Sequence, residues 1–214
     1  MDANELRFLD FIGQRKTKFN IPVYQRNYDW NKDHCKQLLD DILRCGRSKN
    51  ITSHFIGSIV YIHTDIYSTG KIKDLVIIDG QQRITTVTLI YIVLYKLLKK
   101  LGRDDDSEEI FESFLTNKRT EEKLKLRSTQ NNHKALEHLI NSYEYDSFSE
   151  YSKLIENYKY FHSRINEKKI EVIDKGLSKL VFVEISLDRS NDNPQRIFET
   201  LNSACISDFP SIPS

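Results

Sequence analysis

The sequence has little of what marks secreted, metal-binding or membrane proteins. It contains only three cysteines, and Cys35, Cys45 and Cys205 have neither a metal-ligand spacing nor the even number of a disulfide framework. No uninterrupted apolar stretch reaches the roughly 18 residues that a membrane span requires. The acidic residues 1–5 lack the apolar core of a signal peptide. We therefore expect a cytoplasmic protein without a membrane partner.

An excess of charge of either sign is also missing. Lysine and arginine number 32 against 31 aspartates and glutamates, which gives a net charge of +1. The protein as a whole is therefore not attracted to nucleic acid, and DNA binding would require a local basic patch. A charged fraction of 29% and a mean hydropathy of −0.53 indicate a water-soluble protein. The length of 214 residues favours one domain, with or without an elaborated insert.

The spacing of apolar residues, glycines and caps predicts alternating helices and strands over the first half of the chain. The expected elements are a short helix before Gly13, an extended segment at 21–30, a helix from Asn31 to a stop at Gly46, strands at 54–62 and 75–78, and a helix over about 84–101 that Gly102 ends. This order is typical of an α/β core.

The second half of the chain indicates an insertion followed by a return to the core. In residues 103–175 charged runs alternate with helical segments, which predicts a solvated helical insertion between core residues 1–102 and 176–203. Its charge runs are interpreted as exposed helix faces, with a binding surface as the alternative. A strand at 180–187 and a helix begun by Asn193 and Pro194 return to the core. Residues 204–214 are interpreted as an irregular, truncated tail.

The most informative stretch is the end of the 75–78 strand. Asp79 and Gly80 follow it, and two amides, Arg83 and two hydroxyls follow in turn at the start of a long helix. The free N–H groups and the dipole of a helix start favour an anion such as phosphate. In this interpretation Asp79 holds a metal-bound water or polarises an attacking water, Gly80 allows close backbone approach, and Arg83 pairs with phosphate.

The other polar residues of the stretch fit the same interpretation, but a structural alternative exists. Gln81 or Gln82 would contact a base or orient water, and Thr85 or Thr86 would donate to phosphate or bind a metal. Alternatively, Asp79 and Gln82 form a variant capping box that satisfies the helix N–H groups without a ligand. On spacing alone the capping alternative is favoured. No Walker A loop is present.

Two further segments carry candidate groups. Tyr24, Gln25 and Arg26 lie in a run that ends with aromatic residues, which suits stacking on a base and holding a phosphate. The alternative is an aromatic staple between a strand and the following helix. On the helix after Asn193, Glu199 and Asn202 share a face that could bind a metal or read a sugar, or simply face solvent.

The order of these blocks resembles one known family. The blocks are Ile21-Pro22-Val23-Tyr24-Gln25-Arg26-Asn27-Tyr28-Asp29-Trp30, Phe55-Ile56-Gly57-Ser58-Ile59-Val60, Ile78-Asp79-Gly80-Gln81-Gln82-Arg83-Ile84-Thr85-Thr86 and Ile197-Phe198-Glu199-Thr200-Leu201-Asn202-Ser203. The chain is similar, from about residue 5 to residue 203, to the N-terminal domain of GmrSD-type modification-dependent restriction proteins.

The resemblance implies a ParB/sulfiredoxin-like α/β core with a large helical insertion. It also implies binding and hydrolysis of a nucleoside triphosphate (GTP or ATP) with Mg²⁺, coupled to the sensing of modified phage DNA. Carried over residue by residue, Asp79, Gly80, Gln81, Gln82 and Arg83 form the nucleotide site, with Tyr24, Gln25 and Arg26 as neighbours and Glu199 and Asn202 closing the pocket. In the hypothesis that follows, Asp79, Gln82 and Arg83 are the catalytic residues, Asp79 is the candidate metal ligand, and Thr85 and Thr86 also bind the nucleotide.

The leading hypothesis is thus an NTP-hydrolysing sensor domain of a bacterial anti-phage restriction system. A non-catalytic nucleotide- or DNA-binding module that partners a separate nuclease is the alternative. Direct nuclease action by a ParB-like core has least support, because the sequence shows no metal-ligand cluster. Many relatives carry an HNH-type nuclease domain, and nothing similar is present here, so we expect any DNA cleavage to depend on a separate HNH-type domain or subunit.

Overall fold

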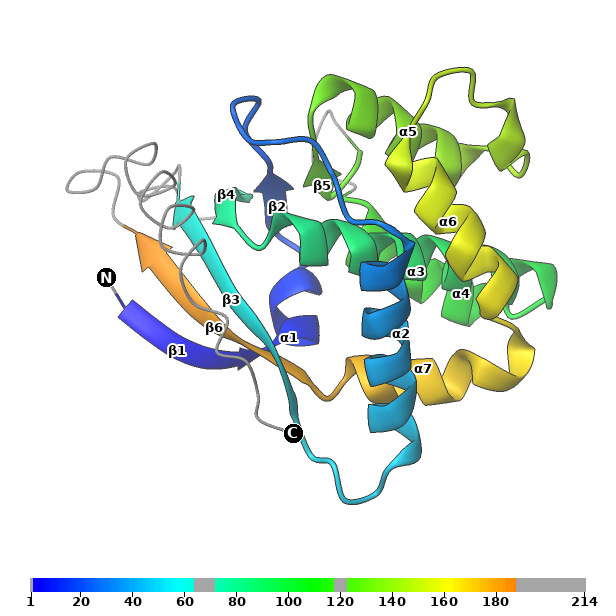
Figure 1. Ribbon diagram of the computed structural model, residues 1–214, viewed down its shortest axis with the longest axis horizontal. Helices are drawn as coiled ribbons and strands as arrows, with labels where there is room; N and C mark the ends of the chain where they lie inside the picture. Colours follow the sequence, from blue (N-terminus) through cyan, green and yellow to red (C-terminus); the bar gives the residue numbers. More distant parts are fainter. Residues whose placement is uncertain (1, 64–71, 118–122, 188–214) are drawn as a thin grey trace.

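The computed structural model describes residues 2–63, 72–117 and 123–187, and it shows a sheet covered by helices (Figure 1). Within these residues six strands form one mixed sheet in the order β1-β6-β3-β4-β2-β5. The strands are β1 (Asp2–Arg7), β2 (Thr17–Asn20), β3 (His54–His63), β4 (Lys73–Asp79), β5 (Leu126–Arg127) and β6 (Leu180–Leu187). Strand β3 runs parallel to β6 and antiparallel to β4, and β4 runs parallel to β2.

The helices gather on one side of this sheet (Figure 1). They are α1 (Phe8–Ile12), α2 (Lys32–Arg47), α3 (Gln81–Lys100), α4 (Asp104–Ile110), α5 (Gln130–Asn141), α6 (Lys153–Arg164) and α7 (Ile170–Leu177), with shorter turns η1 (Phe111–Leu115), η2 (Tyr145–Ser147) and η3 (Glu167–Lys169). In the described part of the chain, no helix combines the length and apolarity of a membrane span. The predicted α/β class is confirmed.

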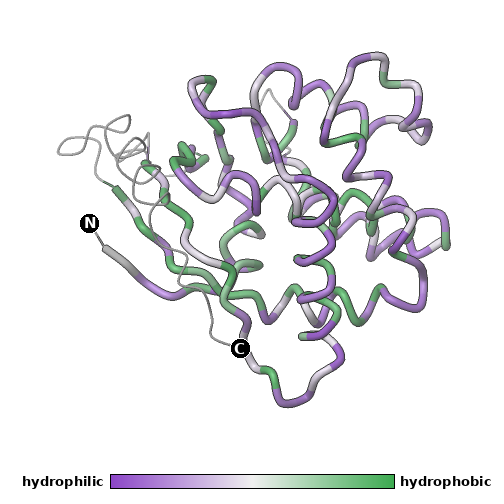
Figure 2. Tube along the Cα trace, viewed as in Figure 1, coloured by the Kyte–Doolittle hydropathy of each residue, from purple (hydrophilic) through white to green (hydrophobic). Residues whose placement is uncertain are grey.

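The central strands bury side chains on both faces of the sheet. In β3, Ile59 and Tyr61 join the large core beneath the helices, whereas Val60 and Ile62 belong to a smaller cluster. This alternation is the two-residue period of a strand, and in β4 Ile77 and Ile78 divide in the same way. Hydrophobic residues accordingly predominate along the central strands and α3 (Figure 2).

A local signal sets the start of helix α2, and a tertiary contact explains the glycine near its end. It begins as predicted at Asn31, whose side chain accepts from the main-chain N–H of Asp33 and of His34. The predicted stop at Gly46 is wrong, because the helix continues to Arg47. At Gly46 a side chain would overlap the main-chain oxygen of Val172 in α7. The glycine therefore allows two helices to approach closely.

The sequence pattern misses the strands that depend on distant partners. Residues 2–7, where the pattern places Leu6 in a helix, form β1 on the edge of β6, and the expected helix is reduced to α1. Strands β2 and β5 pair with each other and are four and two residues long. Such short segments carry too few residues for a readable period.

The 103–175 segment is mainly helical, as predicted, yet it is continuous with the core. Its strand β5 extends the sheet, and Leu136, Leu154 and Phe161 lie in the same hydrophobic cluster as Phe8. The predicted helix after Asn193 and the irregular tail at 204–214 lie outside the described residues. Of the cysteines within the described residues, Cys35 and Cys45 are buried and free.

Candidate functional site

The turn from β4 into α3 places Asp79 and Gly80 at the start of the longest helix. Gly80 has a φ of +94°, a conformation that favours glycine, and a Cβ atom there would lie 2.8 Å from the Cγ1 of Ile59. Helix α3 begins at Gln81, and among the described residues no side chain caps it. The capping-box alternative is therefore wrong. Asp79 remains in β4 opposite Val60, and the Gln82 amide bonds to the main chain of residues 27–30.

The two glutamine amides hold the chain segment 26–30, which we call the brace. The Gln81 amide nitrogen donates to the main-chain oxygen of Arg26 over 3.1 Å. The Gln82 amide oxygen accepts from the main-chain N–H of Asp29 at 3.0 Å and of Trp30 at 3.3 Å, and its nitrogen donates to the oxygen of Asn27. Both side chains are buried, so their hydrogen bonds fix the brace across the start of α3.

Gln25 and Thr86 fasten the same segment from either side. Gln25 is buried and donates to the main-chain oxygens of Ile77 and Ile78, just past the last pairing of β2 with β4. The Thr86 hydroxyl lies 2.8 Å from the hydroxyl of Tyr28 and also donates to the main chain of its own helix. Burial raises the pKa of Tyr28. The segment predicted to be an aromatic staple and the two glutamines at the start of α3 therefore belong to one structural unit.

Arg83 connects this unit to β3. Its guanidinium donates to the main-chain oxygen of Ser58 and lies directly over Gly57, where a Cβ atom would come within 2.9 Å of the Arg83 Cζ. Gly57 has a φ of +101°, and the pairing of β3 with β6 shifts register between Phe55 and Ser58. An irregularity in the strand therefore makes room for the arginine.

Few of the predicted site groups remain accessible. Asp79 is half-buried, and its carboxylate has no hydrogen-bond or ion-pair partner among the described residues. Tyr24 is 52% exposed and the Arg26 side chain is exposed, whereas Thr85 is buried. Glu199 and Asn202 lie outside the described residues. The groups left for a ligand are thus a carboxylate, an aromatic ring, two guanidinium groups and the start of α3.

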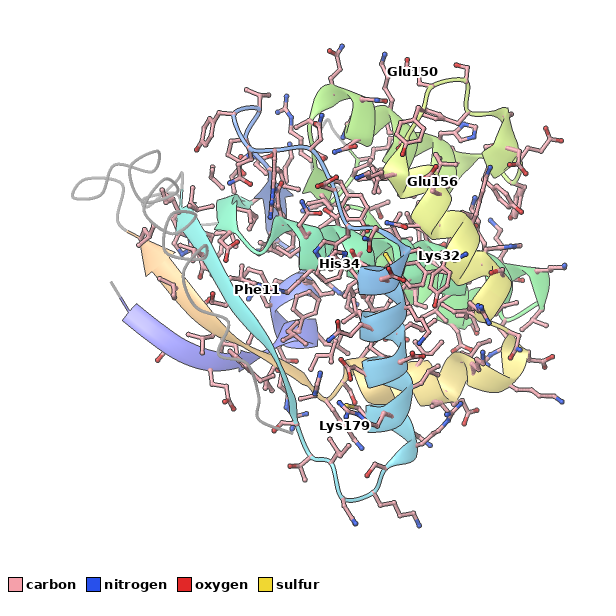
Figure 3. All side chains as sticks on the ribbon, in the orientation of Figure 1. Phe11, Lys32, His34, Glu150, Glu156 and Lys179 are labelled. Carbon is pink, nitrogen blue, oxygen red and sulfur yellow. The ribbon has the colours of Figure 1, made fainter. Side chains whose placement is uncertain are left out.

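The two arginines face different hollows. Arg83 lines a pocket of about 260 Å³ together with Trp30 and the exposed Phe55. His34 at the start of α2 (Figure 3) also lines the pocket. Its ring stacks on that of Trp30, with 5.6 Å between the ring centroids. Arg26 lines a pocket of about 300 Å³ beside α5 and α6. A ligand held by Arg83 would thus lie between α2 and β3.

Sequence reasoning gives no site role to Gly57, Ser58 and the groups around them. A lone glycine inside a strand is the available signal, because it often marks a bulge or a close approach. The pairing of His54 with Asp41 at 3.5 Å, on the wall of the Arg83 pocket, has no signal in the sequence. Within the described ranges no group of three or more His, Cys, Asp or Glu side chains is placed to hold a metal ion.

Comparison with known proteins accounts for the order of these blocks. A search of curated proteins finds no match. The family model described as the GmrSD restriction endonuclease, N-terminal domain, matches residues 8–206. The match covers most of the chain and includes the brace, the bulge at Gly57 and the turn at Gly80. The chain therefore belongs to the family of GmrSD restriction endonuclease N-terminal domains and is a module of a restriction system.

Proposed function

We propose that the chain binds and hydrolyses a nucleoside triphosphate, GTP or ATP, at the start of α3, and that this reaction serves the sensing of modified phage DNA. The observation that carries the proposal is the uncapped start of α3, with Asp79, partnerless among the described residues, before it and Arg83 in its first turn. Main-chain N–H groups at such a helix start bind phosphate readily.

The proposal assigns roles to Arg83, Gly80 and Asp79. Arg83 and the α3 N–H groups hold the phosphates, and Gly80 lets the phosphates approach the main chain. Asp79 accepts the proton of the attacking water or holds a metal ion. Mg²⁺ usually binds proteins through one or two carboxylates together with substrate phosphates, so a single aspartate fits it, and when bound it would neutralise phosphate charge. Tyr24, Glu199 and Asn202 remain predicted neighbours of the nucleotide.

Gln81, Gln82, Gln25 and Thr86 receive a different role. Their polar atoms bond to the brace, to β4 or to the helix itself, so we assign them to positioning. To orient an attacking water, Gln82 would first have to release Asp29 and Trp30. The catalytic role of Gln82 and the ligand contacts of the other three stay predictions.

The test is hydrolysis by purified protein with Mg²⁺ and each of the four common nucleoside triphosphates. We expect turnover by the wild type, and a loss of at least about 100-fold in kcat for Asp79→Asn, which keeps the shape but removes the charge. Arg83→Lys, which keeps the charge but loses the paired donors, should mainly raise KM. Asp105→Asn on the exposed face of α4 is the matched control. Equal activity of Asp79→Asn and wild type would refute the assignment.

One observation favours a second function, a module that binds nucleotide without turnover. The glutamines that could orient water are already engaged with the main chain. Calorimetric binding of nucleotide by folded wild type, with no product formed, would select this alternative. In both cases we propose that the chain acts on DNA together with an HNH-type nuclease domain or subunit.

A further inference from the structure

A second pocket, of about 300 Å³, lies between the brace and the first turns of α5 and α6. Asn131 and Asn132 line it from α5, and Ser152 and Lys153 line it from the start of α6. Both helices have twelve residues, and in the described part of the chain no side chain caps either of them. Two helix starts, each with N–H groups that lack a side-chain acceptor, therefore face one hollow.

Ser152 is an independent sign of a ligand. It is the N-cap residue of α6 and only 7% exposed, yet its hydroxyl has no hydrogen-bond partner among the described residues. A buried hydroxyl without a partner is destabilising. Thr129, the N-cap residue of α5, instead donates to the side chain of Asn27 in the brace. An anion in the pocket would accept from the Ser152 hydroxyl and from the free N–H groups.

Basic residues continue from this pocket along α6. Lys153 also lines a larger groove, of about 620 Å³, that Lys32 at the start of α2 and Lys159 and Arg164 on α6 share. Lys32 lies on the side of α2 that faces α6 (Figure 3). From Lys153 to Arg164 the helix rises about 16 Å. Along the axis of a DNA duplex each strand carries one phosphate per about 3.4 Å, so an α6 parallel to that axis would span about five phosphates of one strand.

Acidic residues reduce the positive charge along α6 but do not neutralise it. Lys153 pairs with Asp29, and Lys159 pairs with Asp146. Glu156 also lines the larger groove. The two aspartates are more than 60% exposed, and such surface pairs contribute little. A phosphate can therefore replace an aspartate as the partner of either lysine.

We propose that these residues form a track for the phosphodiester backbone of DNA. One phosphate sits at Ser152 between the starts of α5 and α6, and the strand follows Lys153, Lys159 and Arg164 along α6. The net charge of +1 gives no general attraction to DNA, so binding depends on this local concentration of donors and cations. The inference rests on the DNA-sensing part of the proposed function and not on nucleotide hydrolysis.

The test uses two substitutions, each with a matched control, and a labelled duplex of about 20 base pairs followed by fluorescence anisotropy at several salt concentrations. Ser152→Asp places a carboxylate that caps α6 but repels phosphate, so we expect binding at least about 10-fold weaker with an unchanged or higher Tm. Thr52→Asp, on an exposed loop, controls for charge. Arg164→Gln should reduce the salt slope of log K by about 1. Arg47→Gln, at the end of α2 away from Lys32, should leave the salt slope unchanged.

Each outcome supports or overturns the proposed DNA track. Weaker binding by Ser152→Asp than by Thr52→Asp, with nucleotide hydrolysis unchanged in both, supports the track. Equal binding by these two variants overturns it and leaves DNA binding to another surface. Calorimetric binding of inorganic phosphate that Ser152→Asp abolishes, while DNA binding persists, assigns the pocket to a free anion instead. Absence of DNA binding by wild type overturns the DNA part of the proposed function together with the track.

Discussion

At the scale of single residues, the site depends on positions where a side chain is absent. Gly57 leaves space for the guanidinium of Arg83, and Gly80 leaves space for Ile59. Both have a positive φ, which costs an L-residue with a Cβ atom about 1–2 kcal/mol. The glycines thus place the arginine and the helix start within one corner of the sheet.

Gly57→Ala should therefore lower the free energy of unfolding and also displace Arg83. We expect a destabilisation of at least about 1 kcal/mol from the backbone alone, measured by urea denaturation, and a loss of nucleotide hydrolysis. Gly102→Ala is the control, because Gly102 has a φ of +73° and a Cβ atom there would have no neighbour within 4 Å. It should lose similar stability but retain hydrolysis. Comparable hydrolysis by both variants would contradict the role of Gly57.

The positioning role of Gln82 leads to a separate prediction. Gln82→Leu leaves two main-chain N–H groups of the brace without an acceptor, which should destabilise the protein by about 2 kcal/mol. The loosened brace should be cut faster by trypsin after Arg26, as followed by mass spectrometry. Asp79→Asn, which leaves the brace bonds intact, should be cut at the wild-type rate. A brace that stays resistant in Gln82→Leu would be inconsistent with this role.

At the scale of elements, the contact between α2 and α7 rests on a reciprocal pair of glycines. A Cβ atom on Gly46 would overlap the main chain of α7 at Val172, and one on Gly176 would overlap the main chain of α2 at Ile42. The two helices therefore touch through their backbones. Helix α7 leads into β6 through a short turn, so this contact also helps to place β6 beside β3.

This contact reverses the usual effect of alanine in a helix. Replacing a helical glycine by alanine normally stabilises by about 1 kcal/mol. Here Gly46→Ala and Gly176→Ala should each destabilise by about 1–3 kcal/mol, because the helices must separate. The double variant should lose less than the sum, since both changes open one interface. Thermal denaturation measures all three, and a gain in Tm for either single variant would disprove the close approach.

At the scale of the whole molecule, two buried lysines hold the 103–175 segment: Lys96 bonds it to α3, and Lys125 bonds two parts of the segment to each other. Lys96 of α3 donates to the main-chain oxygen of Ser142, and Lys125 donates to that of Ser113. Burial lowers the pKa of each lysine to about 8. In the unfolded chain the same groups stay protonated up to about pH 10.4.

Each lysine should therefore add to the free energy of unfolding as the pH rises from about 8 to about 10, because in this window the unfolded lysine is protonated and the buried one is not. Burial raises the pKa of the Cys35 thiol to about 11 and also raises that of Cys45, so from about pH 8.5 the cysteines act in the opposite direction. Above about pH 10 the free energy of unfolding should fall, because burial raises the pKa of Tyr28, Tyr61 and Tyr91 and the unfolded tyrosines ionise first.

Urea denaturation across this range of pH measures both effects. Lys96→Met should lower the slope of stability against pH between about pH 8 and pH 10 relative to the wild type, and the exposed control Lys100→Met should not. A wild-type slope in Lys96→Met would refute the prediction.

The fold is predictable where its signal is local. Asn31 begins a helix by bonding to residues two and three positions away, and β3, β4 and β6 carry enough β-branched and aromatic residues to show as strands. Strands β2 and β5 escape prediction because four and two residues show no readable period, and β1 because its residues are mostly polar. The predicted capping of α3 is wrong, because the competing partners of Gln82 belong to the brace.

Period and composition are local properties, and they suffice to place an acidic residue, a glycine, two amides and an arginine at the start of a long helix. Which of those groups are free depends on the fold. Gln82 bonds to Asp29, 53 residues away, and Arg83 in α3 bonds to Ser58 on strand β3. Because a buried amide must satisfy its hydrogen bonds wherever partners lie, the folded chain engages the glutamines and leaves Asp79 without a partner among the described residues.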